Sequence, residues 1–172
     1  MMIRAEVERA QRVEGGRLAD LYVRHAPGAI RLAYLITGDR TLAEDLVQEA
    51  FTRLAARFLD IRAPEAFEAY LRKTVVNLCN SHFRRKKVER AYVERVSGTL
   101  GIEAYQPDID SKHLVRQALF QLPQRQRAAI VLRYYGDLSE AQTARILGCR
   151  VGTVKSLVSR GMAKLKNEVR RE

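Results

Sequence analysis

Several features that identify other classes of protein are missing from this sequence. Only two cysteines occur in 172 residues, Cys79 and Cys149, so we expect no disulfide framework of the kind that holds small secreted domains together. No run of about 18 apolar residues is present, and the start of the chain contains no apolar signal core. These absences predict a soluble, cytoplasmic protein that does not associate with a membrane.

Residue patterns of catalytic and metal sites are equally scarce. No Gly-rich phosphate-binding loop occurs, and the acidic residues are scattered rather than gathered with His or Cys. Cys79 and His82 have the C-x-x-H spacing of half a zinc site, but a second pair of ligands is missing, so packing is the favoured interpretation. We therefore expect no catalytic residue, no metal and no cofactor, and we predict that the protein is not an enzyme.

Positive charge is abundant and unevenly distributed. The chain has 31 Lys and Arg against 20 Asp and Glu, a net charge of +11, and basic chains of this size mostly bind nucleic acid or anionic membrane. Residues 96–111 hold no cation and three acids, together with two Gly and a Pro, and lack helical periodicity. This composition is typical of a flexible linker. It predicts two domains, residues 1–95 and 112–172.

Residues 137–166 predict two short helices joined by a tight turn. Ser139 and Gln142 have the spacing of a capping box, and Gly148 is a typical C-terminal glycine. The second helix has an apolar stripe and, opposite it, a face that mixes short hydroxyls with long cations. A helix-turn-helix uses such a mixture in the major groove of DNA, although an ordinary solvated basic face remains the alternative. The residues of this face are Thr153, Lys155, Ser156, Ser159, Arg160 and Lys164.

Two helices are expected near the start of the chain. The first runs from Arg17 to Thr37, with a kink or a break at Pro27. The second begins at Thr41, which has capping-box spacing to Glu44, and buries a broad apolar face. An acidic stripe lies opposite that face. It is either an ordinary solvated face or a docking surface for a basic protein partner. The stripe consists of Asp45, Gln48, Glu49 and Thr52.

A third helix opens at Pro64 and carries an exposed row of amides and cations. Cations hold phosphates without reading sequence, whereas Asn side chains can pair with base edges. Phe83 and Tyr92 could stack on unpaired bases. Cations at the C-terminal end of a helix also interact favourably with the helix dipole. Four consecutive cations exceed what this interaction requires, so nucleic acid is the favoured partner. The row consists of Lys73, Asn77, Asn80, Arg84 and Lys87, with Arg85 and Lys86 completing the run of cations.

Taken together, these segments resemble a bacterial RNA polymerase sigma factor of the extracytoplasmic-function (ECF) group of the sigma-70 family. The resemblance rests on AEDLVQEAF (43–51), YLRKTVVNLCNSHFRRKK (70–87) and the stretch from Leu122 to Leu165, in that order. It implies an all-α fold of two small helical domains joined by a flexible linker. The C-terminal domain is then a helix-turn-helix domain of four helices.

The resemblance also implies partners and residue roles. Residues 43–51 would bind the clamp helices of the largest subunit of core RNA polymerase, and the C-terminal domain would touch the flap of the second-largest subunit. Promoter DNA would be bound at two elements, and an anti-sigma factor is a further candidate partner. The implied polymerase-binding residues are Asp45, Gln48, Glu49 and Phe51. The minus-ten residues are Lys73, Asn77, Asn80, Arg84, Arg85, Lys86 and Lys87, and the minus-thirty-five residues are Arg150, Thr153, Lys155, Ser156, Ser159 and Arg160.

Some positions depart from the family pattern. Thr143 stands where the family has isoleucine, which predicts poorer packing of the first helix of the helix-turn-helix. Arg150 replaces the usual serine before the recognition helix, which removes a favoured cap and adds a candidate phosphate contact. Leu157 replaces a common arginine, and Ser81 an aspartate. These departures concern promoter preference more than fold.

A conventional repressor or activator is the main rival. Such a protein would use the same helix-turn-helix but would need a dimer face, and the remaining helices show no uncommitted apolar heptad stripe.

Overall fold

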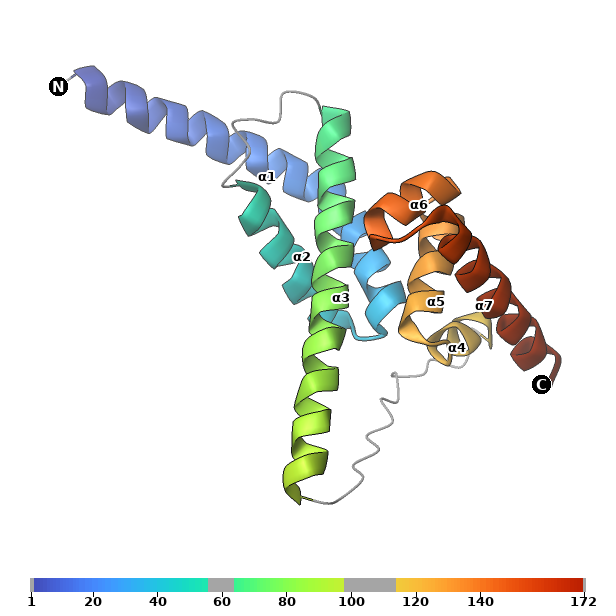
Figure 1. Ribbon diagram of the computed structural model, residues 1–172. Coiled ribbons are helices and arrows are strands. Elements are labelled where there is room, and N and C mark those ends of the chain that lie inside the picture. Colours follow the sequence, from blue (N-terminus) through green and yellow to red (C-terminus); the bar gives the residue numbers. More distant parts are fainter. Residues whose placement is uncertain (1, 56–63, 98–113, 172) are drawn as a thin grey trace.

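The computed structural model describes residues 2–55, 64–97 and 114–171, and all regular structure in these ranges is helical, as predicted. Most of the predicted linker lies outside the described residues. Three N-terminal helices cross one another beside a second group of helices from the C-terminal half (Figure 1). In order, the elements are α1 (Met2–Thr37), α2 (Arg40–Ala55), α3 (Pro64–Ser97), α4 (Leu114–Phe120), α5 (Gln124–Ile130), the π-helix η2 (Val131–Tyr135), α6 (Glu140–Leu147) and α7 (Val151–Arg171).

The N-terminal core lies where α1, α2 and α3 meet. Ile36 of α1, Val47 of α2 and Phe67 of α3 are each at most 1% exposed. The ring of Phe51 packs at 5.7 Å from the ring of Phe67. Fully burying an aliphatic or aromatic side chain of this size stabilises a fold by about 1.5 to 3 kcal/mol. The periodic apolar positions of the sequence therefore form one core.

The first helix is longer than predicted, and of the two alternatives left open at Pro27, a kink or a break, the structure excludes the break. It begins at Met2 instead of Arg17, and it continues through Pro27 without a break. Proline leaves the carbonyl four residues earlier without its helical donor. That carbonyl belongs to Val23, which is 76% exposed, so water can take the place of the missing donor. The exposed position explains why Pro27 does not end the helix.

The start of α2 is also corrected. Asp39, not Thr41, caps the helix, because its Oδ1 accepts a hydrogen bond from the Leu42 amide at 3.0 Å. Glu44 is not part of a capping box; its carboxylate accepts from Arg40 Nε at 3.1 Å. Gly38 precedes the cap with φ 83°, a conformation that favours glycine and reverses the chain between α1 and α2.

In the C-terminal half, α5 runs directly into η2. The Gly136 amide donates to the Val131 carbonyl five residues earlier, at 2.9 Å, so the helix widens by one residue in this turn. Gly161 lets α7 approach α5 closely, because a Cβ atom at Gly161 would lie only 2.6 Å from Ile130 Cδ1. The sequence patterns gave no indication of this π-helical turn.

The short helix α6 has the predicted ends. Ser139 Oγ accepts from the Gln142 amide at 3.2 Å, and Gln142 Oε1 accepts from the Ser139 amide at 2.8 Å, which completes the capping box. Gly148 ends the helix in the left-handed conformation, with φ 61°. Thr143 is fully buried, and its hydroxyl has no hydrogen-bond partner among the described residues. The position where the family pattern has isoleucine therefore carries an unsatisfied polar group.

None of the described helices is both long enough and apolar enough to cross a membrane.

Thr143→Val should stabilise the protein, because valine has the shape of threonine but no hydroxyl to leave unpaired. A buried unsatisfied hydroxyl costs about 1 to 3 kcal/mol, so we expect the free energy of unfolding in urea to rise by about 1 kcal/mol or more. Thr52→Val is the matched control, since the exposed Thr52 hydroxyl donates to the Gln48 carbonyl at 3.0 Å. An increase no larger than that of the control would contradict the assignment.

Candidate nucleic-acid and polymerase interfaces

The predicted minus-ten row lies along α3. Lys73 and Asn77 are exposed, Asn80 is half-buried, and the four consecutive cations Arg84, Arg85, Lys86 and Lys87 are all exposed. This part of α3 extends past the packed helices (Figure 1). The cations are therefore open to a partner, whereas Asn80 sits where the two halves of the chain meet.

Cys79 and His82, on the same helix, differ in burial. Cys79 is fully buried, and burial raises the pKa of its thiol to about 12. Burial, followed by the nearby charges of Lys86 and Arg85, lowers the pKa of His82, so this side chain adds no cation to the row at neutral pH. Within the described residues no group of three or more His, Cys, Asp or Glu could hold a metal ion. The burial of Cys79 favours packing over zinc binding.

The second helix of the helix-turn-helix is α7. Val154, Leu157 and Leu165 form the buried face of this helix, and the side chains predicted to face DNA lie on its other face. Lys155, Ser156, Ser159, Arg160 and Arg150 are exposed, and Thr153 is half-buried. The backbone carbonyl of Arg150 accepts from the amides of Thr153 and Val154 at 2.9 and 3.2 Å. Arg150 thus takes part in the first turn through its main chain, and its side chain remains available.

Two cations of α7 already have intramolecular partners. Lys155 Nζ lies 3.6 Å from a carboxylate oxygen of Glu140 on α6. Arg160 Nε donates to the backbone carbonyl of Ser156 at 3.2 Å, which holds the side chain along its own helix. Both side chains are exposed, and exposed pairs of this kind are worth at most about 1 kcal/mol. DNA can therefore compete for both.

The acidic stripe of α2 faces outward. Asp45, Gln48 and Thr52 are exposed, and Glu49 is half-buried and pairs with Arg53 at 2.5 Å. The polymerase contact implied for Phe51 stays a prediction. In the free chain this side chain is only 5% exposed and packs edge-on against Tyr22 at 4.8 Å. It supports the stripe from the core side.

A contact between the two halves centres on Arg127 of α5. This side chain is only 6% exposed, and its guanidinium lies 6.0 Å from the ring centre of Phe83 on α3 and 5.6 Å from that of Phe120 on α4. Arg127 Nη1 also donates to the Phe120 carbonyl at 3.1 Å. The aromatic ring that the sequence assigned to base stacking is therefore covered by an arginine in this arrangement.

Three further contacts hold the halves together. Gln124 Nε2 donates to Asn80 Oδ1 at 2.5 Å. Tyr34 of α1 meets Phe120 edge to face at 5.6 Å, and the Arg31 guanidinium lies 5.5 Å from the ring centre of Tyr135. We refer to these four contacts, including that of Arg127, as the seam.

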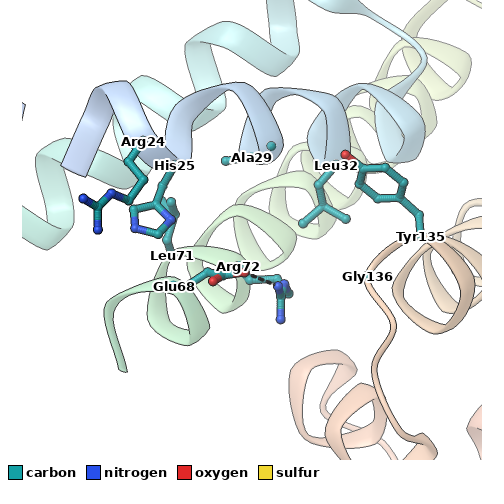
Figure 2. Close-up of a pocket in the computed structure, with 10 residues that line it drawn as sticks. Arg24, His25, Ala29, Leu32, Glu68, Leu71, Arg72, Tyr135 and Gly136 are labelled. Carbon is teal, nitrogen blue, oxygen red and sulfur yellow. Dashed lines mark hydrogen bonds and ion pairs between the residues drawn. The ribbon is translucent and has the colours of Figure 1, made fainter. Parts of the chain in front are cut away.

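A pocket of about 370 Å³ lies beside the seam, lined by residues of α1 and α3 and by Tyr135 and Gly136. Figure 2 shows Arg24 and His25 at one end of this pocket and Tyr135 at the other, with the Glu68–Arg72 ion pair between them. The buried Nε2 of His25 has no hydrogen-bond partner in the described part of the chain. A buried polar atom is therefore left unsatisfied beside the seam.

Sequence reasoning missed the seam, because its residues belong to helices that are far apart in the chain. One local signal was available. Arg127 directly precedes the apolar run of residues 128–132 and itself faces the interior. A cation in such a position needs a partner that compensates for its burial.

Comparison with known protein families gives two matches, each to one half of the chain. Residues 21–89 match the family described as "Sigma-70 region 2", and residues 112–165 match "Sigma-70, region 4". The first match contains α2 and the row on α3, and the second contains the helix-turn-helix.

Similar proteins cover nearly the whole chain. The ECF RNA polymerase sigma factor SigM of Mycobacterium tuberculosis is 35% identical over 159 residues, which span 91% of this chain and 80% of that protein. The RNA polymerase sigma-E factor of Streptomyces coelicolor is 32% identical over 149 residues, 86% of this chain and 84% of that protein. The ECF RNA polymerase sigma factor SigW of Bacillus subtilis is 27% identical, with 99% of this chain and 98% of that protein aligned.

Solved structures agree. The sigma factor RpoE of Bartonella quintana, solved in complex with the anti-sigma factor NepR, superposes with a TM-score of 0.65 at 25% identity, over 87% of this chain and 94% of that one. CnrH, solved with the cytosolic domain of CnrY, has the same fold, with a TM-score of 0.61 at 22% identity over 90% of this chain and 88% of that one.

Proposed function

Since the chain belongs to the ECF group of sigma-70 RNA polymerase sigma factors, which direct promoter-specific transcription initiation, we propose that its surfaces divide this task. Residues 1–95 would bind core polymerase and the minus-ten element, and residues 112–172 the minus-thirty-five element. One observation carries the assignment: an outward acidic stripe on α2 and exposed cations on α3 and α7 occur in one chain. Transcription by core polymerase with and without the protein, on a matched promoter, tests it.

The acidic stripe is the proposed polymerase contact. Asp45, Gln48 and Glu49 are solvent-accessible on a helix whose other side is fixed in the core by residues such as Val47 and Phe51. A carboxylate surface on a protein of net charge +11 gives the chain one face that attracts a basic partner while the remainder repels it. Such a distribution favours a single docking orientation.

Glu49→Lys should weaken binding to core RNA polymerase by roughly tenfold or more while leaving the fold intact. The change reverses a charge at the proposed contact and breaks the ion pair with Arg53, and surface pairs of this kind contribute little to stability. Affinity for core polymerase, measured without DNA, and the helical circular dichroism signal are the two readouts.

Glu89→Lys is the matched control, since it makes the same charge change on exposed α3, away from the stripe. It should bind core polymerase as the parent does. Equal affinity of the Glu49 variant and the parent would mean that the stripe is only solvated.

The two DNA-binding roles follow from residue chemistry. On α3, the cations from Arg84 to Lys87 suit phosphate contacts, whereas Asn77 and Asn80 suit base edges of an opened minus-ten strand. On α7, the exposed Lys155, Ser159 and Arg160 suit duplex in the major groove. We assign base reading to Arg160 and phosphate contact to Lys155.

Arg160→Ala should reduce holoenzyme binding to a matched minus-thirty-five element by about 1 to 3 kcal/mol and change binding to a scrambled element much less. Lys155→Ala should weaken binding to both templates alike. It should also reduce the slope of the logarithm of affinity against the logarithm of salt concentration by about one unit. Lys166→Ala, an exposed cation farther along α7, serves as the control for charge alone. If both test variants match this control on both templates, α7 is not the reader.

Further partners follow from the relatives. Because the RpoE structure contains the anti-sigma factor NepR, we infer that a protein of that class also binds this chain. We place the protein in the bacterial cytoplasm with its polymerase. The family consists of non-catalytic initiation factors, and we propose no catalytic activity, metal or cofactor for this member.

A further inference from the structure

The helix-turn-helix carries a carboxylate among its cations. In residues 138–167 the only acid is Glu140, at the start of α6. Glu140 Oε2 lies 3.6 Å from Lys155 Nζ on α7, and both side chains line a groove of about 500 Å³ together with Ser159 and Lys166. A negative charge therefore lies on the surface to which we assign phosphate contact. The cations of this stretch are Arg145, Arg150, Lys155, Arg160, Lys164 and Lys166.

The direction of the Glu140 side chain is not explained by its own helix. An acid in the first turn favours the helix dipole wherever its carboxylate points, and the start of α6 is already stabilised by the capping box of Ser139 and Gln142. The Glu140 side chain is 38% exposed, against 64% for Lys155, and its carboxylate reaches across to α7. The ion pair thus connects the two helices and restricts where the ammonium of Lys155 lies.

A carboxylate and a DNA phosphate compete for the same ammonium. Both are anions that accept hydrogen bonds through oxygen, and the ammonium of Lys is a compact charge that pairs with either. An exposed ion pair changes an equilibrium by about fivefold at most, so phosphate can displace Glu140 but has to do so before it can bind Lys155. Because phosphates carry no sequence information, this competition lowers affinity for every duplex alike.

We propose that Glu140 is a positioning residue that competes with phosphate for Lys155 and so lowers the affinity of the C-terminal domain for DNA of any sequence. This inference rests on the phosphate contact proposed above for Lys155. The base contact proposed for Arg160 is separate, because that side chain is held by the Ser156 carbonyl of its own helix. With less affinity from phosphate, a larger share of binding comes from base readout.

The test is equilibrium binding of holoenzyme to duplex with a matched or a scrambled minus-thirty-five element over a salt series. Glu140→Gln keeps the size and polarity of the side chain but removes its charge, and the helical circular dichroism signal should not change. Affinity for both templates should rise roughly threefold. The slope of the logarithm of affinity against the logarithm of salt concentration should steepen by up to about one unit, because Lys155 is no longer neutralised before it meets phosphate.

Asp137→Asn is the matched control, since it removes one exposed carboxylate from the same half, three residues before Glu140. Asn tolerates the positive φ of 46° at this position. The control should change affinity less than twofold. When Glu140→Gln is combined with Lys155→Ala, affinity should exceed that of Lys155→Ala alone by no more than the control changes it, because the carboxylate then has no ammonium to hold.

The outcomes separate this inference from the proposed function. A rise with Glu140→Gln no larger than that with Asp137→Asn overturns the inference. An equal rise in the parent and in the Lys155→Ala background also overturns it, since Glu140 would then act only through its general charge. In both cases a loss of affinity with Lys155→Ala leaves the phosphate role intact. If Lys155→Ala changes neither affinity nor slope on either template, the phosphate role fails, and the inference fails with it.

Discussion

The buried guanidinium of Arg127 is the interaction on which the relation between the two halves depends. Placing a charge where it is only 6% exposed costs free energy, and the faces of Phe83 and Phe120 and the Phe120 carbonyl offset part of that cost. If the halves separated, Phe83 would leave and water would hydrate the cation instead. An apolar side chain in the same place would regain nothing on exposure. The charge therefore makes this contact specific, and hydration of the guanidinium would offset part of the cost of breaking it.

A second constraint is the division of each helix into a fixed face and a free face. In α2, Val47 and Phe51 are committed to the core, so the acidic residues on the other side keep a constant direction. In α7, Val154 and Leu165 do the same for the exposed hydroxyls and cations. Recognition of a polymerase and of a duplex both require side chains whose direction is set before binding. The core supplies that order, and the surface chemistry is then free to define the partner.

The all-α fold and both ends of α6 could be predicted from sequence, because capping and apolar periodicity act within a few residues. Ser139 and Gln142 lie three residues apart, so their pattern is legible locally. The predictions were wrong where the tertiary environment determines the local structure. Asp39 replaced Thr41 as the cap, and α1 begins at Met2 and continues through Pro27. The seam could not be predicted, because the hydrogen bond between Asn80 and Gln124 joins residues 44 positions apart.

The π-helical turn at Val131–Tyr135 also limits how the chain can change in length. One residue more than an α-helical turn is accommodated there, which fixes the rotation of Tyr135 relative to α5. Deleting a single residue there would remove the extra residue and restore ordinary α-helical geometry, because the wider turn takes up five residues where an α-helical turn takes up about four. The elements that follow, beginning with the turn that leads to Ser139, would keep nearly the same direction. A one-residue deletion should thus be better tolerated in these five residues than in the α-helices, where it would turn everything after it by about 100°.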